Sequence, residues 1–158
     1  MLELGCPTTP PMLQTSMTAT ILTLAETRDF LDWEFPQMQA GGRAYHLEEV
    51  GPLSARMRLE AHERFLRPGA TVSGPAMMAL ADYALYAAIL ANIGPVALAV
   101  TTSLTFNFLR KAASGDLLAE CRLLKLGRRL AVGEVLITAA GSSDLVCHAT
   151  GTYSIPPR

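Results

Sequence analysis

The chain has 158 residues, enough for one domain with a substantial core, and 50% of its residues are hydrophobic while only 17% are charged. This composition excludes a disordered chain, which needs low hydrophobicity and high net charge. The formal net charge of −1 provides no positive field for a nucleic-acid backbone, so we expect no nucleic-acid partner.

The cysteines indicate neither a disulfide framework nor a metal site. Cys6, Cys121 and Cys147 are odd in number and form no CxxC motif or His/Cys cluster. We therefore expect no structural metal and a reducing, cytoplasmic location. The longest nearly apolar run, residues 75–91, has Asp82 at its middle, which argues against a membrane span.

The N-terminal residues 1–17 are rich in proline and threonine and lack the basic and apolar regions of a signal peptide. We expect a poorly structured extension there, followed by a single domain over residues 18–158. That domain begins with a short amphipathic helix, which starts near Thr23 and ends before Pro36.

Two strands are predicted next, at residues 43–50 and 53–61, joined by a Gly-Pro turn. A run of strong helix formers follows. Ser73 or Gly74 can cap it, Pro75 suits its first position, and we expect a helix over residues 75–91. Because this helix is apolar on every side, other parts of the protein must surround it.

Four more strand-like segments follow, separated by short turns rich in glycine and serine: residues 96–109, 116–126, 129–140 and 145–155. Continuous alternation in the first places Leu104 and Phe106 on one face and Thr101 and Ser103 on the other. The economical arrangement is an α+β hotdog fold, in which an antiparallel β-sheet wraps around one long central helix. Because exposed sheet edges invite pairing, we expect a homodimer or a dimer of dimers.

Asp82 and Gly74 are the candidate functional residues of the central helix. Asp82 is the only charged residue between Arg67 and Arg110. Since an unpaired buried carboxylate is costly, Asp82 indicates either a function or a carboxylate bonded to tyrosine or backbone groups at a dimer seam. The Gly74 amide can stabilise an oxyanion, or it can belong to an ordinary capping turn.

The distance between these two residues bears on how they would act. Gly74 and Asp82 are separated by about 12 Å along a helix, at 1.5 Å per residue. An oxyanion donor and a carboxylate that serve one carbonyl group must both lie within a few ångströms of it. We therefore expect one subunit of a dimer to supply Gly74 and the other to supply Asp82.

The segments 67–82, 101–112, 114–119 and 127–130 resemble the hotdog acyl-CoA thioesterases of the phenylacetic-acid-degradation type, and the resemblance extends over about residues 43–154. In that family a His-Gly-Gly element opens the central helix, and an acidic residue lies nine positions after the His. Here Ser73 takes the His position, Pro75 takes that of the second glycine, and Asp82 is the acidic residue.

The resemblance implies hydrolysis of an acyl-CoA thioester without a metal or other cofactor, coenzyme A being part of the substrate. It assigns Asp82 as general base or nucleophile, the Gly74 amide as oxyanion donor, and Thr101 as the residue that positions water. Ser73 would cap the helix or hold a water. The candidates for binding the phosphates of coenzyme A are Arg67, Arg110, Lys111 and Arg128, whose alternative role is that of solvated charges at strand ends.

Two other functions remain open at this point. Ser73 cannot carry protons as the family's imidazole can, which favours a non-catalytic acyl-CoA-binding protein. A purely structural oligomeric domain is the third possibility. The histidines, His46, His62 and His148, lie in or beside predicted strands and are interpreted as surface or interface residues.

Overall fold

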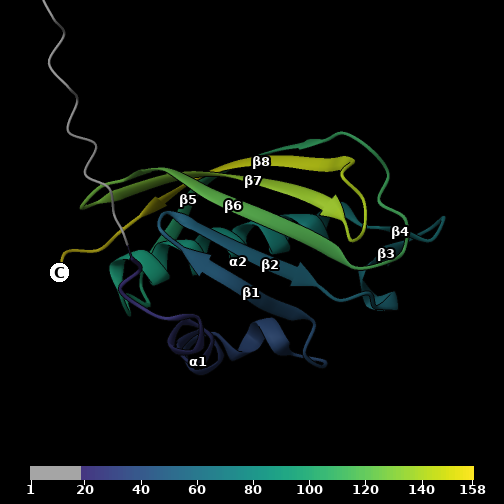
Figure 1. Ribbon diagram of the computed structural model, residues 1–158. Helices are drawn as coiled ribbons and strands as arrows, with labels where there is room; N and C mark the ends of the chain where they lie inside the picture. The colour runs from purple at the N-terminus through teal and green to yellow at the C-terminus, as the bar shows by residue number, and fades with distance from the viewer. Residues whose placement is uncertain (1–18) are drawn as a thin grey trace, which may run out of the picture.

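The computed structural model describes residues 19–158, so the extension predicted at 1–17 lies outside it. A curved antiparallel sheet wraps around one long helix, α2 (Gly74–Ile93), and a shorter helix, α1 (Leu24–Glu34), lies beside the sheet (Figure 1). This arrangement confirms the predicted α+β hotdog fold. The remaining elements are η1 (Pro36–Gln39), β1 (Tyr45–Gly51), β2 (Ser54–Leu59), η2 (Glu63–Phe65), β3 (Leu66–Arg67), β4 (Thr71–Val72), β5 (Val100–Phe108), β6 (Leu117–Leu126), β7 (Leu130–Ala139) and β8 (Leu145–Ser154).

Helix α1 begins with a reciprocal capping box. The Glu26 amide donates to Thr23 Oγ1 at 3.2 Å, and the Thr23 amide donates to Glu26 Oε2 at 2.8 Å. The helix ends at Glu34, just before the Phe35-Pro36 pair, because a residue that precedes proline avoids the helical conformation. The predicted helix is thus confirmed, and its C-terminal end places Phe35 next to α2.

Helix α2 is the core of the domain. Ser73 is its N-cap, with the side chain accepting a hydrogen bond from the Ala76 amide at 3.4 Å, and Gly94 ends it with φ of +93°. Helix α2 is long and apolar enough to cross a membrane. However, 83% of an apolar stretch of 18 residues within it is buried inside the fold. It is therefore a core helix, and the predicted range of 75–91 is extended at both ends.

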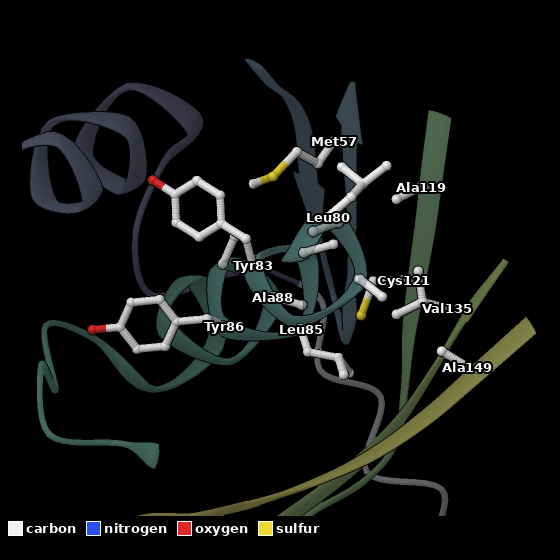
Figure 2. Close-up of a cluster of buried hydrophobic side chains, with 14 of the residues drawn as sticks. Met57, Leu80, Tyr83, Leu85, Tyr86, Ala88, Ala119, Cys121, Val135 and Ala149 are labelled. Atoms are coloured by element: carbon white, nitrogen blue, oxygen red, sulfur yellow. The ribbon is translucent and has the colours of Figure 1, made fainter. Parts of the chain in front are cut away.

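Two glycines let the sheet approach α2 closely. The sheet order is β1-β2-β6-β7-β8-β5, with every neighbouring pair antiparallel. A Cβ atom at Gly133 or at Gly151 would lie 2.6 Å from the side chain of Leu85. Leu85 points from α2 toward the strands that carry Val135 and Ala149 (Figure 2). The absence of side chains at the two glycines therefore allows α2 to pack on β7 and β8.

Strand β5 differs from its prediction in two ways. It begins at Val100 instead of residue 96, because residues 94–99 form turns closed by backbone hydrogen bonds. It also contains a bulge. Thr101 pairs with Tyr153 and Ser103 pairs with Thr152, so Thr102 is an extra residue that has no opposite residue on β8 in the strand register. The prediction of continuous alternation was therefore wrong, since the extra residue turns both Thr101 and Leu104 toward α2.

Candidate active site

Asp82 lies in the middle of α2, and two side chains donate hydrogen bonds to one of its two carboxylate oxygens. Thr101 Oγ1 donates a hydrogen bond to Asp82 Oδ1 at 2.7 Å, and the Tyr153 hydroxyl donates to the same oxygen at 2.6 Å. Within residues 19–158, no group donates a hydrogen bond to Asp82 Oδ2. One oxygen of the carboxylate is therefore fixed, and the other is free to act on a ligand.

Tyr153 is a site residue that the sequence analysis missed. Its side chain is buried, with 3% of the residue exposed, and its hydroxyl also lies 3.0 Å from the backbone oxygen of Asp82. Burial raises the pKa of Tyr153 far above its usual value, and the nearby Asp82 carboxylate raises it further. The phenol thus stays protonated and remains a hydrogen-bond donor at physiological pH.

Asp82 lines a cavity of about 490 Å³, here called the Asp82 cavity. Aromatic side chains dominate its lining, and Tyr83 and Tyr86 extend into this region from the side of α2 that faces away from Cys121 and Val135 (Figure 2). The lining residues are Glu34, Phe35, Met38, Ala79, Asp82, Tyr83, Tyr86, Ala97, Ala99, Val100, Thr101 and Tyr153. An apolar wall that ends at a carboxylate suits an acyl group whose reactive carbon lies near that carboxylate.

The aromatic wall is rigidly packed. The ring of Phe35 packs edge-on against the rings of Tyr83 and Tyr86, with centroid distances of 5.9 and 6.2 Å. The Tyr86 hydroxyl donates to the Ala97 backbone oxygen at 3.0 Å, which fixes the ring. Burial raises the pKa of Tyr83 well above its usual value, so this phenol too stays neutral. The aromatic side chains that α2 contributes to the wall of the Asp82 cavity, Tyr83 and Tyr86, are therefore fixed in place beside the Asp82 carboxylate.

Gly74 lies at a second cavity, of about 390 Å³, here called the Gly74 cavity. As the first residue of α2, Gly74 has an amide that no intrahelical acceptor reaches, and no other described residue accepts a hydrogen bond from it. The lining residues are Arg67, Thr71, Val72, Gly74, Met77, Phe108, Leu109, Arg110, Lys111 and Ala112. A free amide at a helix N-terminus, with cationic side chains nearby, suits an anionic ligand.

The structure divides the predicted site residues into two groups. Asp82 and Thr101 meet at the Asp82 cavity, while Gly74, Arg67, Arg110 and Lys111 share the Gly74 cavity and Ser73 caps the helix beside it. Arg128 lies in the turn between β6 and β7 and lines neither cavity. One copy of the domain therefore places the predicted site residues at two separate cavities.

The chain is similar in sequence and in structure to known thioesterases. A family model described as Thioesterase superfamily matches residues 69–146, which include Gly74, Asp82 and Thr101. A crystal structure of a proposed thioesterase of Silicibacter sp. TM1040 is 45% identical, with a TM-score of 0.80, and the match covers 89% of this chain and 96% of that one. The fold is thus shared with that protein.

Two further relatives are more distant. A variant of the phenylacetic acid degradation protein PaaI of Thermus thermophilus is 28% identical, with a TM-score of 0.66, and the match covers 77% of this chain and 99% of that one. A proposed esterase of Saccharolobus solfataricus is 27% identical over 145 residues, which are 92% of this chain and 87% of that protein. Both matches extend over most of this chain.

Proposed function

Because the chain belongs to the thioesterase superfamily, we propose that it hydrolyses an acyl-CoA thioester to a free acid and coenzyme A. Membership of the superfamily supports thioester hydrolysis as the reaction. The observation that carries the proposal is the environment of Asp82: its Oδ1 accepts hydrogen bonds from Thr101 and Tyr153, no described group donates to its Oδ2, and the residue lines a cavity rich in aromatic side chains.

In the proposed reaction, the Gly74 amide donates a hydrogen bond to the carbonyl oxygen of the thioester. This contact stabilises the negative charge that forms on that oxygen as the carbonyl carbon is attacked. Asp82 either removes a proton from the attacking water or attacks the carbonyl carbon itself to form an anhydride that water then cleaves. The C–S bond breaks in both routes, and the thiolate of coenzyme A leaves and is protonated.

The residues of the two cavities would form one active site if two copies paired through β5. This strand is an edge of the sheet, and exposed apolar residues lie on it or within two residues of its ends: Leu98, Val100, Phe108 and Leu109. Antiparallel pairing of two β5 strands would set the Thr101 end of one against the Phe108 end of the other. The partner subunit's Gly74 would then face Asp82, and the functional unit would be a homodimer, alone or within a dimer of dimers.

The cations of the Gly74 cavity support coenzyme A as the thiol component. Arg67, Arg110 and Lys111 are exposed and line this cavity together with the free amide. Coenzyme A carries a diphosphate and a separate phosphate group, for which guanidinium groups are suited donors. In the proposed dimer the nucleotide lies along this cationic rim while the acyl group enters the partner subunit's Asp82 cavity.

One observation favours a second candidate function, the binding of acyl-CoA without hydrolysis. Ser73 stands where the resembled family has histidine, and a hydroxyl cannot exchange protons near neutral pH as an imidazole does. In that case the same two cavities would hold the ligand, and the Asp82 carboxylate would act only as a polar contact. The two functions differ in whether the C–S bond is broken.

A thiol-release assay distinguishes them. The purified protein is incubated with acetyl-, hexanoyl-, palmitoyl- and benzoyl-CoA, and free coenzyme A is measured with a thiol reagent. We expect release with at least one substrate, and we expect Asp82→Asn to reduce it by about 10²- to 10⁴-fold, as for a lost general base. Tight binding without release from any substrate would replace hydrolysis with the binding function.

A further inference from the structure

We propose that Tyr153 is a positioning residue for Asp82, which it holds so that only Oδ2 can reach the substrate. This inference rests on the proposed function, because it assigns Tyr153 its role in the reaction of Asp82. Two contacts carry it. The Tyr153 hydroxyl lies 2.6 Å from the Asp82 carboxylate and 3.0 Å from the backbone oxygen of the same residue.

The register of β5 and β8 creates this arrangement. Tyr153 is paired with Thr101 directly across the two strands, at the edge of the β5 bulge. The bulge turns Thr101 toward α2, and the two hydroxyls therefore converge on Asp82 Oδ1 from neighbouring strands. Two donors on one oxygen restrict rotation of the carboxylate and leave the second oxygen as the reactive one.

Tyr153 is itself held in place. Its ring stacks on the ring of Tyr86, with a centroid distance of 6.3 Å and an angle of 19° between the planes. Tyr86 is fixed in turn by its hydrogen bond to the Ala97 backbone oxygen. A buried ring that is packed in this way presents its hydroxyl to Asp82 in one geometry only.

The Tyr153 hydroxyl is the one phenol among the described residues that contacts the Asp82 carboxylate. The other titratable groups that line this cavity are Glu34, at the end of α1, and Tyr83 and Tyr86, on α2. Neither of these two tyrosines donates a hydrogen bond to Asp82. Removal of the Tyr153 hydroxyl should therefore leave Thr101 as the one described donor to the Asp82 carboxylate, which is then free to rotate.

The test compares Tyr153→Phe with Tyr45→Phe. Both changes remove one hydroxyl from a buried tyrosine, but Tyr45 lies on β1 and lines no part of the Asp82 cavity. For Tyr153→Phe we expect kcat to fall about 10- to 100-fold, the effect of losing a hydrogen bond to a charged group. KM should stay close to the wild-type value, because the lost contact is to the reacting carboxylate and not to the substrate. Tyr45→Phe should change neither quantity.

A second readout does not depend on turnover. Carbon-13 NMR of protein with labelled aspartate carboxyl groups detects the carboxyl signal of Asp82, which is assigned through Asp82→Asn. We expect the chemical shift of this signal at pH 7 to change in Tyr153→Phe and not in Tyr45→Phe, even if the wild type cleaves no thioester and the proposed function fails. A Tyr153→Phe protein with wild-type kcat and an unchanged Asp82 carboxyl signal would overturn the assignment.

Discussion

Gly74 and Asp82 lie on the same helix, yet they line two different cavities of the domain. Eight residues separate them, which corresponds to about 12 Å along α2. The Asp82 cavity has the carboxylate and the aromatic wall, and the Gly74 cavity has the free amide and the cationic residues. The proposed reaction needs all of these groups, and β5, an edge strand that lies beside both cavities, is the element that can bring two copies together.

The cationic rim should bind the nucleotide part of the substrate and contribute little to the chemistry. We expect the double variant Arg110→Ala, Lys111→Ala to raise KM for an acyl-CoA about tenfold or more, because charge-assisted contacts to phosphate are lost. The value of kcat should change little. With an acyl-pantetheine thioester, which lacks the nucleotide phosphates, the variant and the wild type should have similar KM values.

Arg122→Ala serves as the control for that pair, because Arg122 is an exposed residue that binds Glu134 and lines neither cavity. It should leave KM for acyl-CoA unchanged. Equal increases of KM for acyl-CoA and acyl-pantetheine would contradict the assignment of Arg110 and Lys111 to the phosphates.

Ser73 should stabilise the helix start more than it promotes turnover. The Ala76 amide donates to its hydroxyl at 3.4 Å, which is long for a cap, so Ser73→Ala should cost toward the lower end of about 0.5–2 kcal/mol. Urea unfolding measures this cost, and Ser73→Asn, which keeps a capping group, should recover it. If Ser73→Ala stayed folded but lost all turnover, Ser73 would be a catalytic residue instead.

Asp116 should make the fold sensitive to acid. Its carboxylate accepts a hydrogen bond from the Ala61 amide at 2.7 Å and from Arg58 at 2.9 Å, and these contacts, the backbone one first, lower its pKa. A lowered pKa in the folded state means a stabilisation that is complete above the ordinary value of about 4 and is lost as the pH falls through the folded-state value. The difference in Tm between the wild type and Asp116→Ala should thus be largest near pH 7 and should shrink toward pH 3. A difference that is the same at both pH values would show that the carboxylate charge plays no part.

The order of the elements and the central helix could be predicted from the sequence because they depend on local signals. The Ser-Gly-Pro start, the run of helix formers and the terminal glycine define α2, and short Gly-rich turns separate β6, β7 and β8. The nine-residue spacing from Ser73 to Asp82 likewise lies within one segment of the chain. These features need no knowledge of which strands pair.

The environment of Asp82 could not be predicted in the same way. The contact between Tyr153 and Asp82 spans 71 residues and depends on the pairing of β5 with β8. The bulge at Thr102 reverses the face on which later residues of β5 lie, and no local pattern marks it. Alternation does place Tyr153 on the same face as Gly151 and Ala149, so an inward orientation could have been inferred, but its partner could not.

The central claim is that each active site combines Gly74 of one copy with Asp82 of another, and complementation tests it most directly. One variant carries Asp82→Asn. The second carries Gly74→Pro with Pro75→Ala, which removes the Gly74 amide proton while keeping a proline at the helix start, where it is tolerated. Pro75→Ala alone is the control for the second variant and should keep wild-type activity.

Each variant should be inactive alone, and the hybrid of the two, purified through two different affinity tags, is the sample to measure. Our account predicts about half of the wild-type thioesterase activity per dimer, since pairing restores one complete site out of two. A hybrid as inactive as its parents would contradict the account, because it would mean that Gly74 and Asp82 must come from the same chain.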